Sequence, residues 1–435
     1  MPVPASPPGQ GRSGDKQRGL LLREGALADG RSVDVRVLDG YVSEVAPAGT
    51  LSAQSDEEPL DLRGVMVLPG LVEPHAHLDK AFTAADVPNE THDLAGAITA
   101  WLANRSRFSQ EQIVNRARAA ALHYLAHGVT AVRSHTDVGE GVGTRSVEAL
   151  LAVRDELADL IDLQVVALAG LPLSGQEGAN NRAYLRASLE LGADVVGGAA
   201  YLDEDPKASL DIFADIASEF RRPLDLHVDE TTDAGHFTLP DLVDLAWSGF
   251  AQPITASHCV SLGSQSPEVQ SAVAEGAASA GVSVVTLPLT NLYLQARGTM
   301  PAPRGLTALR PLLQAGVTVA AGGDNLRDPF NPMGRADPLE TASLLITAGH
   351  LEPAEAFWAV TEAARTALRL GPGRVEVGAA ADLVAIPGTT VAEVIADAHP
   401  ARLVVKAGRV VARTSTSTEI EDTPEAKVMG RSWSY

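Results

Sequence analysis

Short apolar runs alternate with helix-compatible segments through the middle of the chain. Eight of these runs have the continuous apolar character of strands buried on both faces, at residues 66–77, 128–137, 162–170, 194–201, 223–230, 253–259, 281–291 and 317–325. One intervening helix, 113–127, is preceded by a capping box of Ser109 with Gln112 and is ended by Gly128. Eight such strand–helix units predict an α/β fold, a parallel (β/α)8 (TIM) barrel with a helical jacket.

The two ends of the chain have a different pattern. Short β-like runs joined by glycine-containing turns occupy 19–65 and return at 382–414. We expect both ends to form one small β-sandwich domain, from residues 19–65 and 372–414, around a barrel of residues 66–371. Residues 1–18 read as a disordered leader, and 415–435 as a polar tail that is partly disordered or wraps a neighbouring subunit.

Charge and cysteine content limit the classes of partner. The 34 Lys and Arg against 55 Asp and Glu give a net charge of −21, which repels nucleic acid and anionic membrane surfaces. The longest charge-free stretch, 276–296, is interrupted by polar residues and proline, so no membrane-spanning segment is predicted. A single cysteine excludes intrachain disulfides and thiolate-rich metal sites. We expect a soluble, cytoplasmic protein.

Histidine and aspartate residues stand at the ends of four predicted strands. His75 and His77 alternate along the first strand and therefore face the same side. His227, His258 and Asp324 end strands five, six and eight, at the rim where barrel enzymes have their active sites. Three imidazoles with a carboxylate suit a divalent ion such as zinc or iron. The alternative is that these histidines are structural.

Several motifs together resemble a known family. PGLVEPHAHLDKAFT, GVTAVRSHTDV, LGADVVGG, LDLHVDE, TASHC, PLTNLYLQ and GGDNLRDPFNPMG resemble, in this order, the amidohydrolase superfamily, in the branch of bacterial cytosine deaminase and N-isopropylammelide hydrolase. The resemblance implies a homo-oligomer and a metal ion held by four residues: His75, His77, His227 and Asp324. It also implies an acid/base role for Glu230 and a place for His258 facing the metal-bound water and the substrate.

These residues predict a hydrolytic reaction. The stretch GADVVGGAAYLDED contains no lysine that could bridge two metal ions, so one divalent ion per chain, zinc or iron, is expected. A metal-activated water would attack a small nitrogen heterocycle, Asp324 would take the water proton, and His258 would stabilise developing charge. Glu230 would carry a proton to the leaving amine, which makes the protein an aminohydrolase (deaminase) of an exocyclic C–N bond. Hydrolysis of a cyclic or linear amide, or a catalytically inactive binding barrel, are the alternatives.

Candidate substrate contacts come from residues near the barrel rim. Lys80 is expected to bind a carbonyl or an anionic ring, unless it pairs with Asp79 or lies at the surface. Phe330 stands where relatives have an aromatic that walls the pocket, although a core residue would give the same pattern. His135 ends the second strand and is either a pocket or a structural residue.

Two departures from the cytosine deaminase pattern concern specificity. Cytosine deaminases, which this chain resembles, have a Gln that hydrogen-bonds to the amide edge of the pyrimidine. That Gln is missing here, and Gly170 stands nearest to its place. Gln176 could replace it only with an insertion of several residues. The second of two aspartates after strand eight is here Asn325, whose amide can donate as well as accept. Together, these changes predict a substrate other than cytosine.

Overall fold

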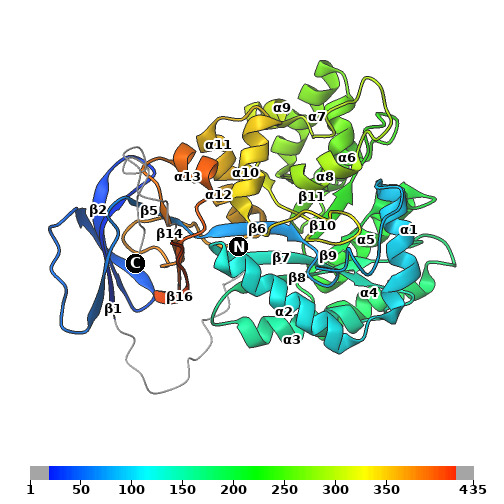
Figure 1. Ribbon diagram of the computed structural model, residues 1–435. Helices are drawn as coiled ribbons and strands as arrows, with labels where there is room; N and C mark the ends of the chain where they lie inside the picture. Colours follow the sequence, from blue (N-terminus) through cyan, green and yellow to red (C-terminus); the bar gives the residue numbers. More distant parts are fainter. Residues whose placement is uncertain (1–18, 418–435) are drawn as a thin grey trace.

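The computed structural model describes residues 19–417 and contains a nearly closed barrel of eight parallel strands (Figure 1). The strands run in chain order around the barrel: β6 (Leu71–Ala76), β7 (Val129–Val138), β8 (Asp162–Ala169), β9 (Val195–Gly198), β10 (Leu224–Val228), β11 (Ile254–His258), β12 (Ser283–Thr286) and β13 (Val319–Ala321). A parallel bridge between Ala76 and Asp324 connects the last strand back to the first. The barrel predicted from the apolar runs is confirmed.

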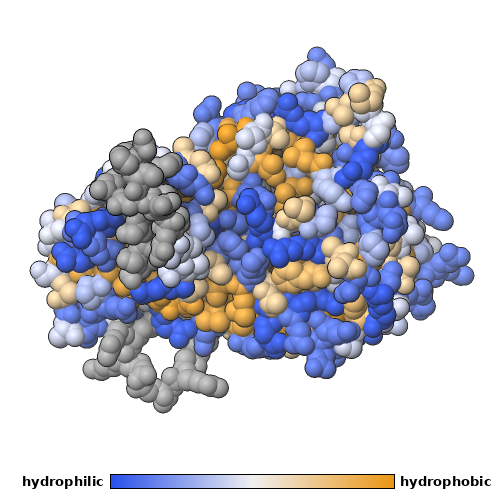
Figure 2. Space-filling model, viewed as in Figure 1, coloured by the Kyte–Doolittle hydropathy of each residue, from blue (hydrophilic) through white to orange (hydrophobic). Residues whose placement is uncertain are grey.

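Helices surround the barrel and leave their polar sides outward. They are α1 (Leu94–Asn104), α2 (Gln110–Ala126), α3 (Arg145–Leu157), α4 (Ala179–Leu191), α5 (Pro206–Phe220), α6 (Leu239–Trp247), α7 (Pro267–Ala280), α8 (Pro288–Leu294), α9 (Leu309–Gln314), α10 (Pro338–Thr347), α11 (Pro353–Ala359), α12 (Glu362–Ala367) and α13 (Val391–Asp397). The capping box of Ser109 and Gln112 is confirmed at the start of α2. Figure 2 shows the result on one face, where hydrophilic residues predominate and apolar residues form smaller patches.

The two chain ends meet in a second, mixed sheet. Its strands are β1 (Gly19–Ala26), β2 (Ser32–Leu38), β3 (Tyr41–Pro47), β4 (Glu57–Asp61), β5 (Val65–Pro69), β14 (Leu383–Pro387), β15 (Arg402–Lys406) and β16 (Arg409–Thr414). Their order is β16-β15-β14-β5-β1-β2-β3, with β4 paired to β1. Antiparallel pairing of β5 with β14 joins the N-terminal to the C-terminal strands. The small β unit built from both ends is confirmed, as one hydrogen-bonded sheet.

Two predicted strands are divided differently in the structure. The run 66–77 is two strands that meet at Gly70, β5 in the mixed sheet and β6 in the barrel. A Cβ at Gly70 would lie 2.5 Å from the Thr130 side chain, so glycine allows this close crossing. The run 281–291 ends as a strand at Thr286, because Pro288 begins helix α8.

The exact domain boundaries stay a prediction. The expected leader, 1–18, and all but the first residues of the expected tail, 415–435, lie outside the described residues. Within 19–417, no helix has both the length and the apolar character needed to cross a membrane.

Candidate active site

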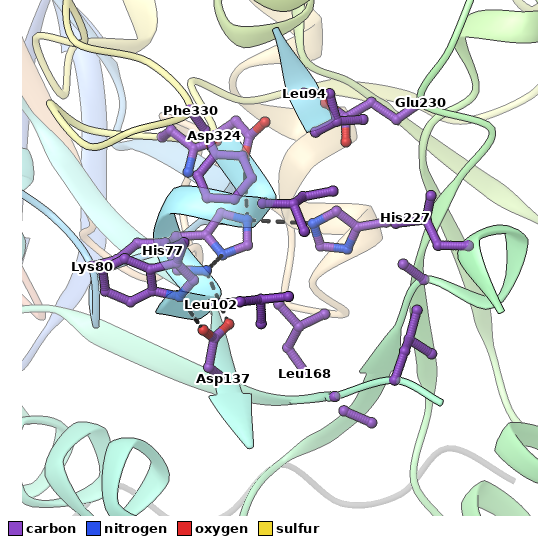
Figure 3. A pocket seen from close by; sticks show the side chains of 18 of the residues that line it. His77, Lys80, Leu94, Leu102, Asp137, Leu168, His227, Glu230, Asp324 and Phe330 are labelled. Atoms are coloured by element: carbon purple, nitrogen blue, oxygen red, sulfur yellow. Dashed lines mark hydrogen bonds and ion pairs between the residues drawn. The ribbon is translucent and has the colours of Figure 1, made fainter. Parts of the chain in front are cut away.

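The carboxyl ends of the barrel strands bring the predicted ligands together. His75 lies on β6 and His77 directly follows it, while His227 lies on β10 and His258 is the last residue of β11. Asp324 follows β13, and its backbone N–H donates to the His75 carbonyl at 3.0 Å where the barrel closes. Figure 3 shows His77, His227 and Asp324 turned toward one another at one end of a pocket.

The ligand atoms of these residues crowd into a small volume. His77 Nε2 lies 3.2 Å from Asp324 Oδ1 and 3.3 Å from His227 Nε2. His75 Nε2 lies 3.6 Å from the same Asp324 oxygen. Ligand atoms of His75, His77 and Asp324 all lie within 4.8 Å of one another. The four predicted ligands are therefore neighbours.

Some ligand atoms of the clustered histidines and Asp324 lack hydrogen-bond partners in the described chain, which indicates a site for a cation. His75 Nε2 and Asp324 Oδ1, 3.6 Å apart, are both buried without a hydrogen-bond partner among the described residues. Burial lowers the pKa of His75 and His227 well below the ordinary histidine value, so these rings are neutral and offer lone pairs. Buried polar atoms without partners are costly, and a shared divalent ion would satisfy them together. The donor set fits such an ion.

Helix α8 holds His258 beside Glu230. Asn291 Nδ2 lies 3.0 Å from His258 Nδ1 and 3.3 Å from Glu230 Oε1. An amide nitrogen only donates, so His258 Nδ1 accepts and its Nε2 carries the hydrogen. Burial lowers the pKa of His258 to about 3, which keeps the ring neutral. His258 therefore presents an N–H donor on the side of Asp324, whose Oδ2 is 4.0 Å from Nε2.

Glu230 is a buried carboxyl group in the wall of the pocket. Its backbone carbonyl accepts a hydrogen bond from Gln295 Nε2 at 2.9 Å. Burial raises the pKa of the Glu230 side chain to about 8. The group can therefore carry a proton near neutral pH, which is the property required of a general acid.

Lys80 is buried beside the histidines rather than exposed at the surface. Its Nζ lies 2.9 Å from Asp137 Oδ1 and 3.4 Å from His77 Nδ1. The rings of Trp101 and Phe330 flank the ammonium group, each centroid 5.4 Å from Nζ. The partner is thus Asp137 and not Asp79, which instead accepts the Asp137 backbone N–H at 3.0 Å.

The pocket contains some of the predicted substrate contacts. Lys80, Asn325 and Phe330 line it, and Asn325 Nδ2 donates to Asp328 Oδ2 at 2.8 Å. Gly170 lines the pocket from the loop after β8, whereas Gln176 of the same loop is exposed and outside the lining. The assignment of Gln176 to substrate binding therefore gains no support from its position.

Sequence reasoning missed three residues of this site: Asp137, Trp101 and Asn291. Asp137 accepts hydrogen bonds from Lys80 and from the Trp101 indole, and Arg105 Nη1 lies 3.8 Å away. A signal was present for Asp137, because it lies in the motif GVTAVRSHTDV at even spacing from Arg133 and His135, and strand side chains at this spacing share one face. Asn291 stands in the motif PLTNLYLQ, but its contact with His258 was not predicted, since it lies on a short helix in a run predicted as strand.

His135 is buried inside the barrel and does not line the pocket. Its ring stacks on His75 with centroids 3.8 Å apart, and its Nε2 lies 3.5 Å from Asp225 Oδ1. It is fully buried and is not among the pocket-lining residues. His135 therefore packs against His75 outside the pocket lining, although one of its ligand atoms also lies within 4.8 Å of those of His75 and His227.

We expect Asp137→Asn to lower the free energy of unfolding by about 3–5 kcal/mol, because it leaves the buried Lys80 ammonium without its carboxylate. Denaturant unfolding followed by circular dichroism measures the loss. A matched double variant, Lys80→Met with Asp137→Asn, should recover at least half of it, since no buried charge then remains unpaired at this pair. Equal stability of Asp137→Asn and the unchanged protein would contradict the assignment of this ion pair.

Comparisons with known proteins were consistent with one another. Residues 92–412 match the profile of the Amidohydrolase family. Pterin deaminase of Rhizobium rhizogenes is 33% identical over 388 residues, 88% of each chain. N-isopropylammelide isopropyl amidohydrolase of Pseudomonas sp. is 28% identical over 91% of this chain and 97% of its own. The crystal structure of 5-methylcytosine deaminase from Klebsiella pneumoniae, liganded with phosphonocytosine, superposes with a TM-score of 0.84 at 27% identity, covering 92% of this chain and 100% of that one.

Proposed function

The chain belongs to the amidohydrolase family, and on this premise we propose that it is a metal-dependent aminohydrolase of a small nitrogen heterocycle. The bond cleaved is an exocyclic C–N bond, as in deamination. The observation that carries the proposal is the convergence of a candidate metal cluster with a buried proton-carrying carboxyl group, Glu230, in one pocket. The metal cluster alone, or the buried carboxyl group alone, would be compatible with a binding site. Together they supply a hydrolytic centre.

We assign the metal to the four crowded ligands: His75, His77, His227 and Asp324. One ion per chain, zinc or iron, suits three imidazoles with one carboxylate. When bound, a divalent ion of this kind supplies a water that loses its proton near neutral pH. Asp324 has a second oxygen, Oδ2, on the side of His258, and can accept that proton there.

The remaining steps belong to residues of the chain itself. His258, held as a neutral Nε2–H donor by Asn291, can hydrogen-bond to the oxygen that becomes the product carbonyl. Glu230 can give its proton to a ring nitrogen, then take the proton that leaves the attacking hydroxyl group as the carbonyl forms and pass it to the leaving amine. The proton held by Asp324 then returns Glu230 to its protonated form. Lys80, Asn325 and Phe330, which line the same pocket, are the proposed contacts to the ring. Burial of these groups excludes bulk water from the proton transfers.

The test is metal content together with product analysis on the purified full-length protein. A panel of aminotriazines, N-alkylaminotriazines, pterins, cytosine, isocytosine and creatinine separates the outcomes. Release of ammonia or an alkylamine supports the proposal. Ring opening without amine release would indicate amide hydrolysis by the same residues, and metal binding without any turnover would indicate a binding protein.

Cytosine is expected to be a poor substrate relative to a ring with a substituted leaving amine or an additional carbonyl. A site that hydrogen-bonds one polar edge discriminates by about 1–3 kcal/mol for each mispaired group. The groups that differ are Gly170, which offers no side chain at the pocket wall, and Asn325, which is a neutral amide. Steady-state kinetics should give a kcat/KM for cytosine at least about 30-fold below that of the best ring. A kcat/KM above about 10⁵ M⁻¹s⁻¹ for cytosine would contradict this argument.

We also propose a cytoplasmic homo-oligomer. The single cysteine, Cys259, is buried and unpaired, which suits a reducing compartment. Light scattering on the purified chain measures the oligomeric state, and a monomer at micromolar concentration would contradict the proposal.

A further inference from the structure

A chain of buried hydrogen bonds runs from His75 into the interior of the barrel. His75 Nδ1 lies 2.9 Å from Ser257 Oγ, and Ser257 Oγ lies 2.9 Å from Asp225 Oδ1. The other carboxylate oxygen, Asp225 Oδ2, accepts from Arg133 at 2.7 Å. All four residues are at most 2% exposed. Neither Ser257, Asp225 nor Arg133 lines the pocket, so none of them contacts a substrate.

The direction of each hydrogen bond follows from the groups involved. The Arg133 guanidinium is always charged, and beside it the Asp225 carboxylate is an acceptor only. Ser257 therefore donates its single hydroxyl hydrogen to Asp225, and it must accept from His75. His75 consequently carries its hydrogen on Nδ1, which leaves a lone pair on Nε2. That atom is the one 3.6 Å from Asp324 and without a hydrogen-bond partner in the described chain.

The far end of this chain is fixed. Arg133 Nε donates to Gln164 Oε1 at 3.0 Å, and Arg133 Nη2 donates to the carbonyl of Ala367, the last residue of α12, at 3.1 Å. Gln164 in turn donates to the Leu368 carbonyl at 2.8 Å. Side chains from four barrel strands, β7, β8, β10 and β11, are thus tied to one another and to a helix end. Such a rigid set can hold an imidazole in one orientation.

We propose that Ser257, Asp225 and Arg133 are positioning residues that fix His75 as the Nδ1–H tautomer and aim its Nε2 into the metal centre. The inference rests on the proposed metal site. Outer partners of a metal-bound histidine raise the affinity for the ion, and their loss typically weakens binding about 10–100-fold. Ser257→Ala removes the acceptor for His75 Nδ1–H and should weaken zinc binding by this factor.

The experiment measures zinc affinity of the full-length chain by competition with a chromophoric chelator, after the bound metal has been removed. Thr286→Val is the matched control, because Thr286 is a buried barrel residue whose hydroxyl has no partner in the described chain. It should change the dissociation constant less than about 3-fold, against 10–100-fold for Ser257→Ala. Ser257→Thr, which keeps the hydroxyl, should restore most of the affinity.

Two further measurements separate positioning from folding. The metal-free Ser257→Ala protein should keep a cooperative unfolding transition, and excess zinc should return it to the stoichiometry of the unchanged protein. Asp225→Asn tests the hydrogen-bonded relay from His75 through Ser257 and Asp225 to Arg133 at a second point. An amide can donate as well as accept, so the Ser257 hydroxyl is no longer required to donate to residue 225 and to accept from His75. Zinc binding should weaken in this variant too. Equal zinc affinity of Ser257→Ala and the unchanged protein would overturn the relay alone. Failure of the unchanged protein to bind zinc or iron would overturn the proposed metal site, and the relay with it.

Discussion

His75→Ala and Asp324→Ala are each expected to abolish turnover and to lower bound metal well below one ion per chain. Each variant removes one of the ligand atoms that lie within 4.8 Å of one another. Three remaining donors hold a divalent ion more weakly than four, and Asp324→Ala also removes the only negative charge among the proposed ligands. Elemental analysis of dialysed protein, beside activity on the best substrate of the panel, measures both effects.

His350→Ala is the matched control for these variants. His350 is exposed and contacts Arg304 by its ring, outside the pocket. It should keep both the metal and the activity. Full metal occupancy in both His75→Ala and Asp324→Ala would remove the ligand assignment, whereas loss of metal in the control as well would indicate a general effect of handling rather than of the site.

Glu230→Gln is expected to keep the fold and the metal and to lower kcat at least about 10²-fold, the usual scale for a general acid or base. Glutamine matches glutamate in shape, so the contact with Asn291 can persist, but the amide cannot transfer a proton on the time scale of turnover. Because Glu230 is not among the proposed ligands, the metal content should stay unchanged. The measurements are kcat under substrate saturation and metal stoichiometry on the same preparation.

The control is Glu204→Gln, which makes the same chemical change at an exposed glutamate. It should leave kcat within about 2-fold, as surface substitutions usually have small effects. A kcat for Glu230→Gln equal to that of the unchanged enzyme would assign the proton shuttle to another group. Loss of metal in Glu230→Gln would instead place this carboxylate among the ligands.

Both predictions depend on a site that sequence spacing located only in part. His75 and His77 could be placed on one face because strand side chains alternate, and the strand ends could be placed at one rim because parallel strands share it. Distances across the barrel, such as the 3.3 Å between His77 and His227, lie between residues 150 positions apart. No local pattern determines them.

The choice of partner for Lys80 shows the same limit. In the sequence, the neighbouring Asp79 was a plausible ion-pair partner, but in the structure the Lys80 ammonium lies against Asp137 of β7. Asp79 is turned to a backbone N–H instead. Asp79 and Lys80 lie in a turn after β6, and the partner of the buried Lys80 side chain comes from strand β7, which packs beside that turn. Sequence proximity therefore carried no information about this pair.

By itself, the sequence determined the fold class, the order of the barrel strands, the joining of both chain ends in a second sheet and the residue types of the candidate metal site. These properties follow from local periodicity, turn residues and motifs, which act over a few residues. Tertiary structure alone decided that Gln176 stays outside the pocket, that Asn291 holds His258 and Glu230, and that Ser257 connects His75 to Asp225 and Arg133. Those contacts depend on the packing and register of elements distant in sequence, where a hydrogen bond requires positions fixed to a few tenths of an ångström.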